Sequence, residues 1–298
     1  MKKKIVIAGG TGFVGKYLAR KFKESGNEVI IISRQPAHVN WIDPEAISVA
    51  LEDAEMLINL AGKSVDCRYN DKNRKEIFGS RIETTKALGE AVLLCKNPPK
   101  LWINSSTATI YRHAEDRPMT ESTGEIGTGF SVNVATNWEK TFFDFKLPHT
   151  RQVALRMAIV LGKDGGVMRP LKNLVRFGLG GKQGYGNQMF SWIHIEDLFN
   201  VILYLQKNNS LTGVFNTSAP NPVTNGTLMH LLRKKMGIHI GLPTPVWLLK
   251  MGAVFIKTET ELVLKSRWVV PERLLQSGFT FSYPTLNDAL NNILGNSK

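Results

Sequence analysis

Residues 4–15, with the sequence KIVIAGGTGFVG, decide the fold of this chain. Lys4–Ala8 form a short, continuous apolar run, which is typical of a parallel strand buried on both faces. Gly9, Gly12 and Gly15 follow at the start of an amphipathic helical pattern. In such a unit the first glycine permits a tight turn, the second lets a phosphate approach the backbone, and the third lets the helix pack on the strand. Because free N–H groups at a helix start attract phosphates, we expect dinucleotide contacts at Gly9, Thr11, Gly12, Phe13, Val14 and Gly15.

Further apolar runs alternate with helical patterns through the first half of the chain. The predicted strands are residues 28–32, 56–60, 101–105 and 153–160, and the clearest helix is Ser80–Cys95. This alternation predicts an α/β fold with a doubly wound parallel sheet of the Rossmann type. After Leu161 the sequence becomes rich in glycine and then in proline. We therefore expect a dinucleotide-binding domain of residues 1–165 and 187–218, and a smaller substrate lobe of residues 166–186 and 219–298.

Composition narrows the class of protein. The 298 residues carry a formal net charge of +13, which suits anionic ligands. The basic residues are scattered, however, so we expect no nucleic-acid partner. We also expect no bound metal. Two cysteines and the lack of a signal peptide favour the cytoplasm. The apolar stretch Val246–Ile256 contains Lys250 and is too short to span a bilayer, so we expect a buried helix there and no membrane partner. A homodimer is left open.

The end of the second predicted strand indicates which dinucleotide binds. Ser33 and Arg34 stand there, with Arg34 19 residues after Gly15. A site specific for NAD usually places Asp or Glu near this position, to bind the ribose 2′-hydroxyl. A guanidinium instead suits a 2′-phosphate, and the hydroxyl of Ser33 can add a hydrogen bond. We therefore predict NADP(H) as the cofactor, with NAD as the alternative if Arg34 is only a surface residue.

Several segments together resemble a known protein family. They include Asn59-Leu60-Ala61-Gly62, residues 75–81 followed by Thr84-Thr85, the Phe190–Asp197 segment with its Trp-Ile-His run, Asn216 with residues 219–225, and Pro271-Glu272-Arg273-Leu274-Leu275. This set resembles the atypical, extended branch of the short-chain dehydrogenase/reductase superfamily. Within that branch it resembles the epimerase family proteins, which bind NADP and end in a small domain of unknown function. The resemblance runs from about residue 4 to about residue 294.

The resemblance implies further cofactor contacts outside the glycine loop. They fall on Ser33, Arg34, Leu60, Ala61, Glu76, Arg81 and Val160. We also expect Gly62, Ser105 and Arg156 to contact the cofactor, and Arg156 can instead bind the substrate. Leu60 and Ala61 close a predicted strand, beside the crevice where ligands bind to such sheets. Arg81 can pair with a phosphate, or it can form a surface ion pair with Glu76.

The catalytic pattern of the superfamily is only half present. Active members carry Ser or Thr after the fourth strand and then Tyr-x-x-x-Lys, whose Tyr moves a proton. Thr107 stands where active members carry this Ser or Thr, after the fourth predicted strand. Counting back from Glu139 places the Tyr position at Ser131 and the Lys position at Ala135, and neither residue can replace the pair.

Other side chains are candidates for the missing role. Tyr111 lies four residues after Thr107 and either reaches the nicotinamide or packs as a structural aromatic residue. His194 is either a base oriented by Asp197 or a buried histidine that holds a loop. Arg156 lies within a buried strand, where a charge needs a partner. Arg169, Arg176 and Lys182 either clamp an anionic substrate or are solvated loop charges.

Two functions follow from this pattern. The first is an NADP(H)-dependent oxidoreductase or epimerase that acts on a small polar or anionic substrate such as a nucleotide sugar, with Thr107, Tyr111 and His194 as candidate catalytic residues. The second is a non-catalytic protein that binds NADP(H) as a redox sensor or scaffold. The missing Tyr and Lys favour the second function, and the retained Ser105-Ser106-Thr107 run favours the first.

Overall fold

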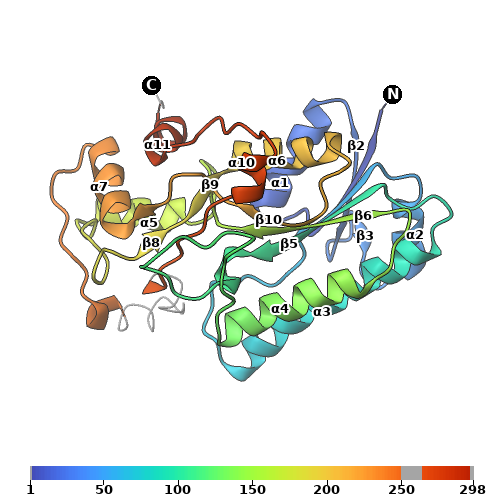
Figure 1. Ribbon diagram of the computed structural model, residues 1–298, viewed down its shortest axis with the longest axis horizontal. Helices are drawn as coiled ribbons and strands as arrows, with labels where there is room; N and C mark the ends of the chain where they lie inside the picture. The colour runs from blue at the N-terminus through green and yellow to red at the C-terminus, as the bar shows by residue number, and fades with distance from the viewer. Residues whose placement is uncertain (1, 250–263, 296–298) are drawn as a thin grey trace.

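A seven-stranded parallel sheet forms the centre of the molecule (Figure 1). The computed structural model describes residues 2–249 and 264–295. The strand order is β10-β6-β5-β4-β1-β2-β3, and every neighbouring pair is parallel. The strands are β1 (Lys4–Ala8), β2 (Glu28–Ser33), β3 (Val39–Asn40), β4 (Met56–Asn59), β5 (Leu101–Thr107), β6 (Arg151–Met157) and β10 (Gly213–Thr217). The predicted doubly wound α/β fold is confirmed.

Helices cover both faces of this sheet because its strands are apolar on both sides. Ile5 and Ile7 of β1 lie in a core with Leu18 of α1, whereas Val6 and Ala8 belong to the core on the opposite face. The first face is covered by α1 (Phe13–Glu24) and α6 (Ile195–Lys207). The second is covered by α2 (Pro44–Leu51), α3 (Asp71–Leu94) and α4 (Phe130–Asp144), and Figure 1 shows α3 and α4 lying side by side.

A second apolar core lies beyond the carboxyl end of the sheet. It includes Met168, Trp192, Leu228 and Leu290. The elements around it are α5 (Met168–Arg176), α7 (Asn225–Lys235), α11 (Leu286–Leu294) and the short strand pairs β7 (Ile159–Leu161) with β9 (Trp192–His194) and β8 (Met189–Phe190) with β11 (Val223–Thr224). The helix α10 (Glu272–Gln276) packs near β10 instead. The domain boundaries given above stay a prediction.

One strand prediction was wrong. The predicted strand of residues 153–160 is divided, because β6 ends at Met157 and Ile159 begins β7, outside the main sheet. At the break, the N–H of Ala158 donates to the carbonyl of Thr217 over 3.0 Å, and the N–H of Ile159 donates to the carbonyl of Ser191. The chain therefore changes partners there, which an unbroken apolar run does not reveal.

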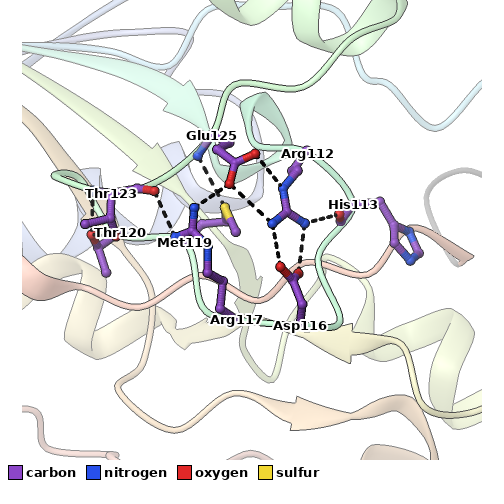
Figure 2. Close-up of polar contacts among 8 residues, drawn as sticks. All are labelled: Arg112, His113, Asp116, Arg117, Met119, Thr120, Thr123 and Glu125. Atoms are coloured by element: carbon purple, nitrogen blue, oxygen red, sulfur yellow. Dashed lines mark hydrogen bonds and ion pairs between the residues drawn. The ribbon is translucent and has the colours of Figure 1, made fainter.

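A long loop between the 3₁₀ turn η1 (Ala108–Ile110) and α4 is held by an ion-pair cluster on the surface. Figure 2 shows the guanidinium of Arg112 between Asp116 and Glu125, at 2.7 Å and 3.0 Å. The bonds from Arg112 hold the pKa of Asp116 below its usual range. The same loop pairs with the C-terminal part of the chain, because the N–H of Met119 donates to the carbonyl of Trp268 over 2.7 Å. The ion-pair cluster thus shapes a loop that contacts the C-terminal part of the chain at Trp268.

Part of the expected C-terminal helix lies outside the described residues. Of the predicted apolar helix Val246–Ile256, residues 250–256 are not described. None of the helices that are described is both long enough and apolar enough to cross a membrane.

Candidate functional site

The three glycines after β1 are required for three different physical reasons. Gly9 has a φ of +76°, and a Cβ there would lie 2.8 Å from the backbone of Ala61. A Cβ on Gly15 would lie 2.6 Å from the Cα of Gly10. A Cβ on Gly12 would meet only the carbonyl oxygen of Gly9, at 3.9 Å, and otherwise open space. Gly9 and Gly15 thus serve the fold, whereas Gly12 leaves room for a ligand.

The helix α1 begins in this loop without a side-chain cap. Gly12 is its N-cap residue and has no side chain to accept a bond from the first turn. The first N–H groups of a helix lack intrahelical acceptors and carry a partial positive charge. An uncapped helix start of this kind is a suitable binding site for phosphate.

A cavity of about 360 Å³ opens in front of this loop, at the carboxyl ends of β1, β4 and β5. The predicted residues that line it are Gly9, Gly12, Phe13, Val14, Gly15, Leu60, Ala61, Gly62, Arg81, Ser105 and Thr107. The lining residues that were not predicted as contacts are Val65, Tyr69, Ile77, Ser106, Thr109, Phe130, Ser131, Val134, Ala135, Trp138 and Met157. Five of these lie on α4, the helix that carries Ser131 and Ala135 at the positions of the superfamily's Tyr and Lys.

Arg81 places a partly buried positive charge in the wall of the cavity. Its guanidinium donates to the carbonyls of Ile77 and Lys63, at 2.9 Å and 3.2 Å, and lies 5.1 Å from the ring of Trp138. Burial lowers the pKa of Arg81 to about 10, so the side chain stays charged at neutral pH. No carboxylate of the described residues pairs with it. The predicted alternative, an ion pair with Glu76, was wrong, because Glu76 pairs with Lys63 instead.

The predicted pair Ser33-Arg34 lies at the carboxyl end of β2, outside the cavity lining. Ser33 is buried, and its hydroxyl bonds to the ring of His38 over 2.9 Å and accepts from the N–H of Gln35. Its side chain thus stabilises the turn after the strand. Arg34 is exposed, and the described residues offer it no ion-pair partner. Its charge is therefore available to a ligand that extends from the cavity over β2.

Hydroxyl groups collect where β5 reaches the cavity. The Oγ1 of Thr107 accepts from the N–H of Thr109 over 3.1 Å, which leaves its own proton free to donate. The buried Oγ of Ser105 has no hydrogen-bond partner among the described residues. Ser106 donates to the carboxylate of Glu139 over 2.5 Å. The hydroxyl of Thr107 can therefore donate to a bound molecule, whereas the Oγ of Ser105 is buried beneath the surface of the cavity.

Two of the candidate residues, Tyr111 and Arg156, lie behind the cavity in a buried polar network. Arg156 forms two hydrogen bonds of 2.8 Å with Glu139 and donates to the Tyr111 hydroxyl over 2.9 Å. The hydroxyl of Tyr111 in turn donates to Asn216 over 2.8 Å, and burial raises its pKa. Neither side chain lines the cavity, so the structure places both where they hold β5, β6 and β10 together.

His194 also lies away from the cavity, at the start of α6. Its Nδ1 accepts from the N–H of Glu196 over 3.2 Å, and its ring packs 3.9 Å from that of Tyr283. Burial lowers the pKa of His194 to about 4, so the ring is neutral at physiological pH. The neighbouring carboxylate of Asp197 accepts from the backbone of Ser282 and Tyr283, at 2.8 Å and 2.9 Å. This arrangement matches the alternative in which the pair holds a loop.

The remaining predicted residues lie outside the lining of the cavity. Thr11 lies in the glycine loop and Glu76 on α3, while Val160 belongs to β7. Arg169, Arg176 and Lys182 are exposed. The structure thus brings together the glycine loop, Arg81 and the hydroxyls of β5, but not the candidate clamp of basic residues.

Comparison with known proteins identifies the family. The sequence matches the model of the NAD dependent epimerase/dehydratase family over residues 5–132 and that of a domain of unknown function, DUF1731, over residues 244–293. It is 33% identical to the human (Homo sapiens) epimerase family protein SDR39U1, over 98% of this chain and 99% of the human protein. This chain belongs to the epimerase family proteins. A family protein from Staphylococcus aureus, SAR0825, is 31% identical over 98% of this chain.

Solved structures of similar proteins share the fold. The crystal structure of human SDR39U1, isoform 2, with NADPH has a TM-score of 0.89 at 32% identity and covers 98% of this chain and 99% of the human chain. A nucleoside-diphosphate sugar epimerase from Corynebacterium glutamicum has a TM-score of 0.80 at 29% identity, over 99% of this chain and 59% of that one. A UDP-N-acetylglucosamine 4-epimerase from Bacillus cereus, at 18% identity and a TM-score of 0.76, shares the fold alone.

Proposed function

We propose that this epimerase family protein is an NADP(H)-dependent oxidoreductase that acts on a small polar or anionic carbonyl compound. The observation that carries the proposal is the uncapped start of α1, which opens into a cavity of about 360 Å³. The human relative of the same family crystallised with NADPH, which supports the choice of cofactor.

The residues present fit the parts of this dinucleotide. The pyrophosphate would lie on the N–H groups after Gly12, where a Cβ would otherwise stand. Arg34 would bind the 2′-phosphate, because an exposed guanidinium at the end of β2 takes the place of the usual carboxylate. Arg81, charged and without a carboxylate partner in the described chain, would add a positive charge to the wall of the same cavity.

The hydroxyls at the end of β5 would position the reacting group of the substrate. When bound, the cofactor supplies hydride transfer, and the protein supplies orientation and electrostatics. Thr107 would donate its free hydroxyl proton to the substrate oxygen, because its Oγ1 already accepts from Thr109 and is thereby oriented. Ser131 and Ala135 line the cavity where the superfamily carries Tyr and Lys, so the transferred proton would come from water. Sugar epimerisation would use the same hydride step.

A second candidate function is a non-catalytic NADP(H) sensor or scaffold. It is favoured by Ser131 and Ala135, since neither side chain can relay a proton to a substrate at neutral pH. Against it stands Thr107, which lines the cavity and whose hydroxyl proton has no acceptor among the described residues, so that it can donate to a substrate oxygen.

Fluorescence of bound NADPH separates these functions. Under the proposal, the purified protein binds NADPH, and a panel of short oxo acids, aldehydes and nucleotide sugars contains a compound that oxidises it. Thr107→Val should keep NADPH binding and lose at least about tenfold in turnover, because the donated hydrogen bond is absent. If NADPH binds and no compound changes its signal, the sensor function is favoured. A protein that binds neither dinucleotide contradicts both.

A further inference from the structure

Two titratable side chains, Tyr69 and Arg81, stand in the described lining of the cofactor cavity. The other described lining residues are glycine, apolar or aromatic residues, or residues with a Ser or Thr hydroxyl. The side chains that usually move protons in catalysis are those of His, Asp, Glu, Lys, Tyr and Cys, and of these only Tyr is found in this lining. Tyr69 is therefore the candidate for a proton donor from the described wall of the cavity.

Tyr69 is held between the start of α3 and the start of α4. Arg74 Nε donates to the carbonyl of Tyr69 over 2.7 Å. The Tyr69 ring packs edge-on against that of Phe130, with 5.2 Å between the ring centroids. Phe130 comes directly before Ser131, which stands where the superfamily carries Tyr, and both line the cavity. The phenol of Tyr69 thus lies beside the part of α4 that lacks one.

Arg81 lies beside the cavity face of the same helix, further along its length. The guanidinium Cζ is 5.1 Å from the centroid of the Trp138 ring. A Cβ on Gly62 would lie 3.0 Å from this Cζ, so the guanidinium fills the space beside Gly62. Trp138 follows Ala135 by three residues, and residues at this spacing are neighbours on a helix face. A positive charge therefore lies near the position where the superfamily carries Lys.

The charges of Tyr69 and Arg81 influence each other. Burial lowers the pKa of Arg81 to about 10, and the phenolate of Tyr69 acts against this decrease. Electrostatic coupling is mutual, so the guanidinium also stabilises the phenolate of Tyr69. Arg74 adds a second cation near Tyr69, but its side chain is exposed and its charge is screened by solvent. Arg81 is therefore the stronger of these two influences on the phenol.

We propose that Tyr69 is the catalytic acid of this cavity and that Arg81 stabilises its phenolate, in place of the Tyr and Lys that α4 lacks. The proposal rests on the proposed function. As hydride from NADPH forms a C–H bond at the substrate carbonyl carbon, the O–H bond of Tyr69 breaks and its proton binds the carbonyl oxygen. NADPH is oxidised, the carbonyl is reduced to an alcohol, and solvent water returns a proton to the phenolate. Arg81 acts through Tyr69 and is a positioning residue.

Tyr69→Phe tests the acid, because it keeps the ring against Phe130 and removes only the hydroxyl. The substrate is a compound that the wild type reduces, measured at saturating NADPH. We expect turnover to fall at least about a hundredfold, as for the loss of a general acid. NADPH affinity, measured by fluorescence, should change by less than about twofold, because the ring remains.

The matched control is Tyr185→Phe, which removes a phenol that is 81% exposed and outside the cavity lining. It should keep both turnover and NADPH affinity within about twofold of the wild type. If Tyr69→Phe turns over as fast as the wild type, this proposal is overturned and the proposed function stands. If the wild type reduces no compound, both are overturned.

A second measurement requires neither cofactor nor substrate. Ionisation of tyrosine changes its ultraviolet absorbance, so subtracting the pH titration of Tyr69→Phe from that of the wild type isolates Tyr69 among the six tyrosines. Arg81→Gln removes the cation, and we expect the pKa of Tyr69 to rise by about one unit. The reference in this background carries Tyr69→Phe as well.

Arg81→Lys separates the charge of Arg81 from its packing. Because the variant keeps a positive charge, the pKa of Tyr69 should rise less than in Arg81→Gln, and turnover at saturating NADPH should be higher than in that variant. A purely structural role of Arg81 would not shift the titration of Tyr69. The same pKa of Tyr69 in the wild type and in Arg81→Gln would overturn the role proposed for Arg81.

Discussion

Adding a methyl group at Gly12 should weaken NADPH binding and leave folding almost unchanged. Gly12→Ala places a Cβ in the open space before α1, where the proposal places the pyrophosphate, and no protein atom obstructs it. We expect NADPH affinity to fall at least about tenfold, while the free energy of unfolding changes by less than about 1 kcal/mol. Fluorescence titration and urea unfolding measure the two quantities.

Gly15→Ala is the matched control for this prediction. Its Cβ would lie 2.6 Å from the Cα of Gly10, so the backbone itself must shift. We expect a loss of stability of about 1–3 kcal/mol, as for other overpacked sites. If Gly12→Ala binds NADPH as tightly as the wild type, the phosphates do not lie on this loop.

At Arg34, one side chain should set the preference between the two dinucleotides. Arg34→Asp replaces the exposed guanidinium with a carboxylate, which repels a 2′-phosphate and accepts from a 2′-hydroxyl. We expect the affinity for NADPH to fall at least about tenfold and that for NADH to be kept or increased. Parallel titrations of the wild type and the variant check this. The same ratio of the two affinities in both proteins would contradict the prediction.

The strands and loops of this protein differ in how far the sequence could predict them. The glycine loop could be predicted because it follows the continuous apolar strand β1. The hydroxyls of β5 could be predicted because they stand at the end of an apolar strand, and such strands end at the ligand-binding edge of a parallel sheet. The break after Met157 was not found, because β6 and β7 are both apolar and differ only in their pairing partners. Long-range pairing of this kind leaves no local pattern.

The ion-pair partner of Arg156 could not be predicted from the sequence for the same reason. The sequence predicted that a charge within β6 needs a partner, and the structure supplies Glu139 from α4, 17 residues away in sequence. That choice depends on how α4 lies across the sheet, which the sequence alone does not give. For the same reason, the sequence could not place Tyr111 behind the cavity, where it bonds to Asn216 of β10.

The ion pair between α4 and β6 should contribute strongly to stability. The side chains of Glu139 and Arg156 are 11% and 12% exposed, and both carboxylate oxygens are bonded. Glu139→Gln leaves the guanidinium buried without a counter-charge, so we expect a loss of about 3 kcal/mol in the free energy of unfolding. Lys140→Gln, which removes an exposed pair with Asp144 on the same helix, should cost less than about 1 kcal/mol. Equal losses in the two variants would contradict this account.

His194 should make the stability of the folded protein depend on pH. Its pKa is about 4 in the folded protein and about 6.5 when the chain unfolds. Unfolding therefore takes up a proton between these values, so stability is fully present above pH 6.5 and falls as the pH decreases towards 4. The contribution of this group is at most about 3 kcal/mol.

Urea unfolding at several pH values tests this expectation. His194→Asn keeps a side-chain acceptor for the first turn of α6 but does not titrate. We expect the free energy of unfolding of the variant to fall less steeply between pH 6.5 and 4. Identical slopes for the variant and the wild type would show that His194 is not responsible.

The main core of the molecule has a consequence for its synthesis. Leu274, Phe279 and Phe281 pack in the same core as Ile5 and Ile7 of the first strand. A ribosome makes these residues after all seven strands of the sheet, so the sheet emerges with one face incompletely covered. The N-terminal half therefore cannot finish folding as an independent unit during translation, and a chain that stops at Thr217 should expose apolar surface and aggregate.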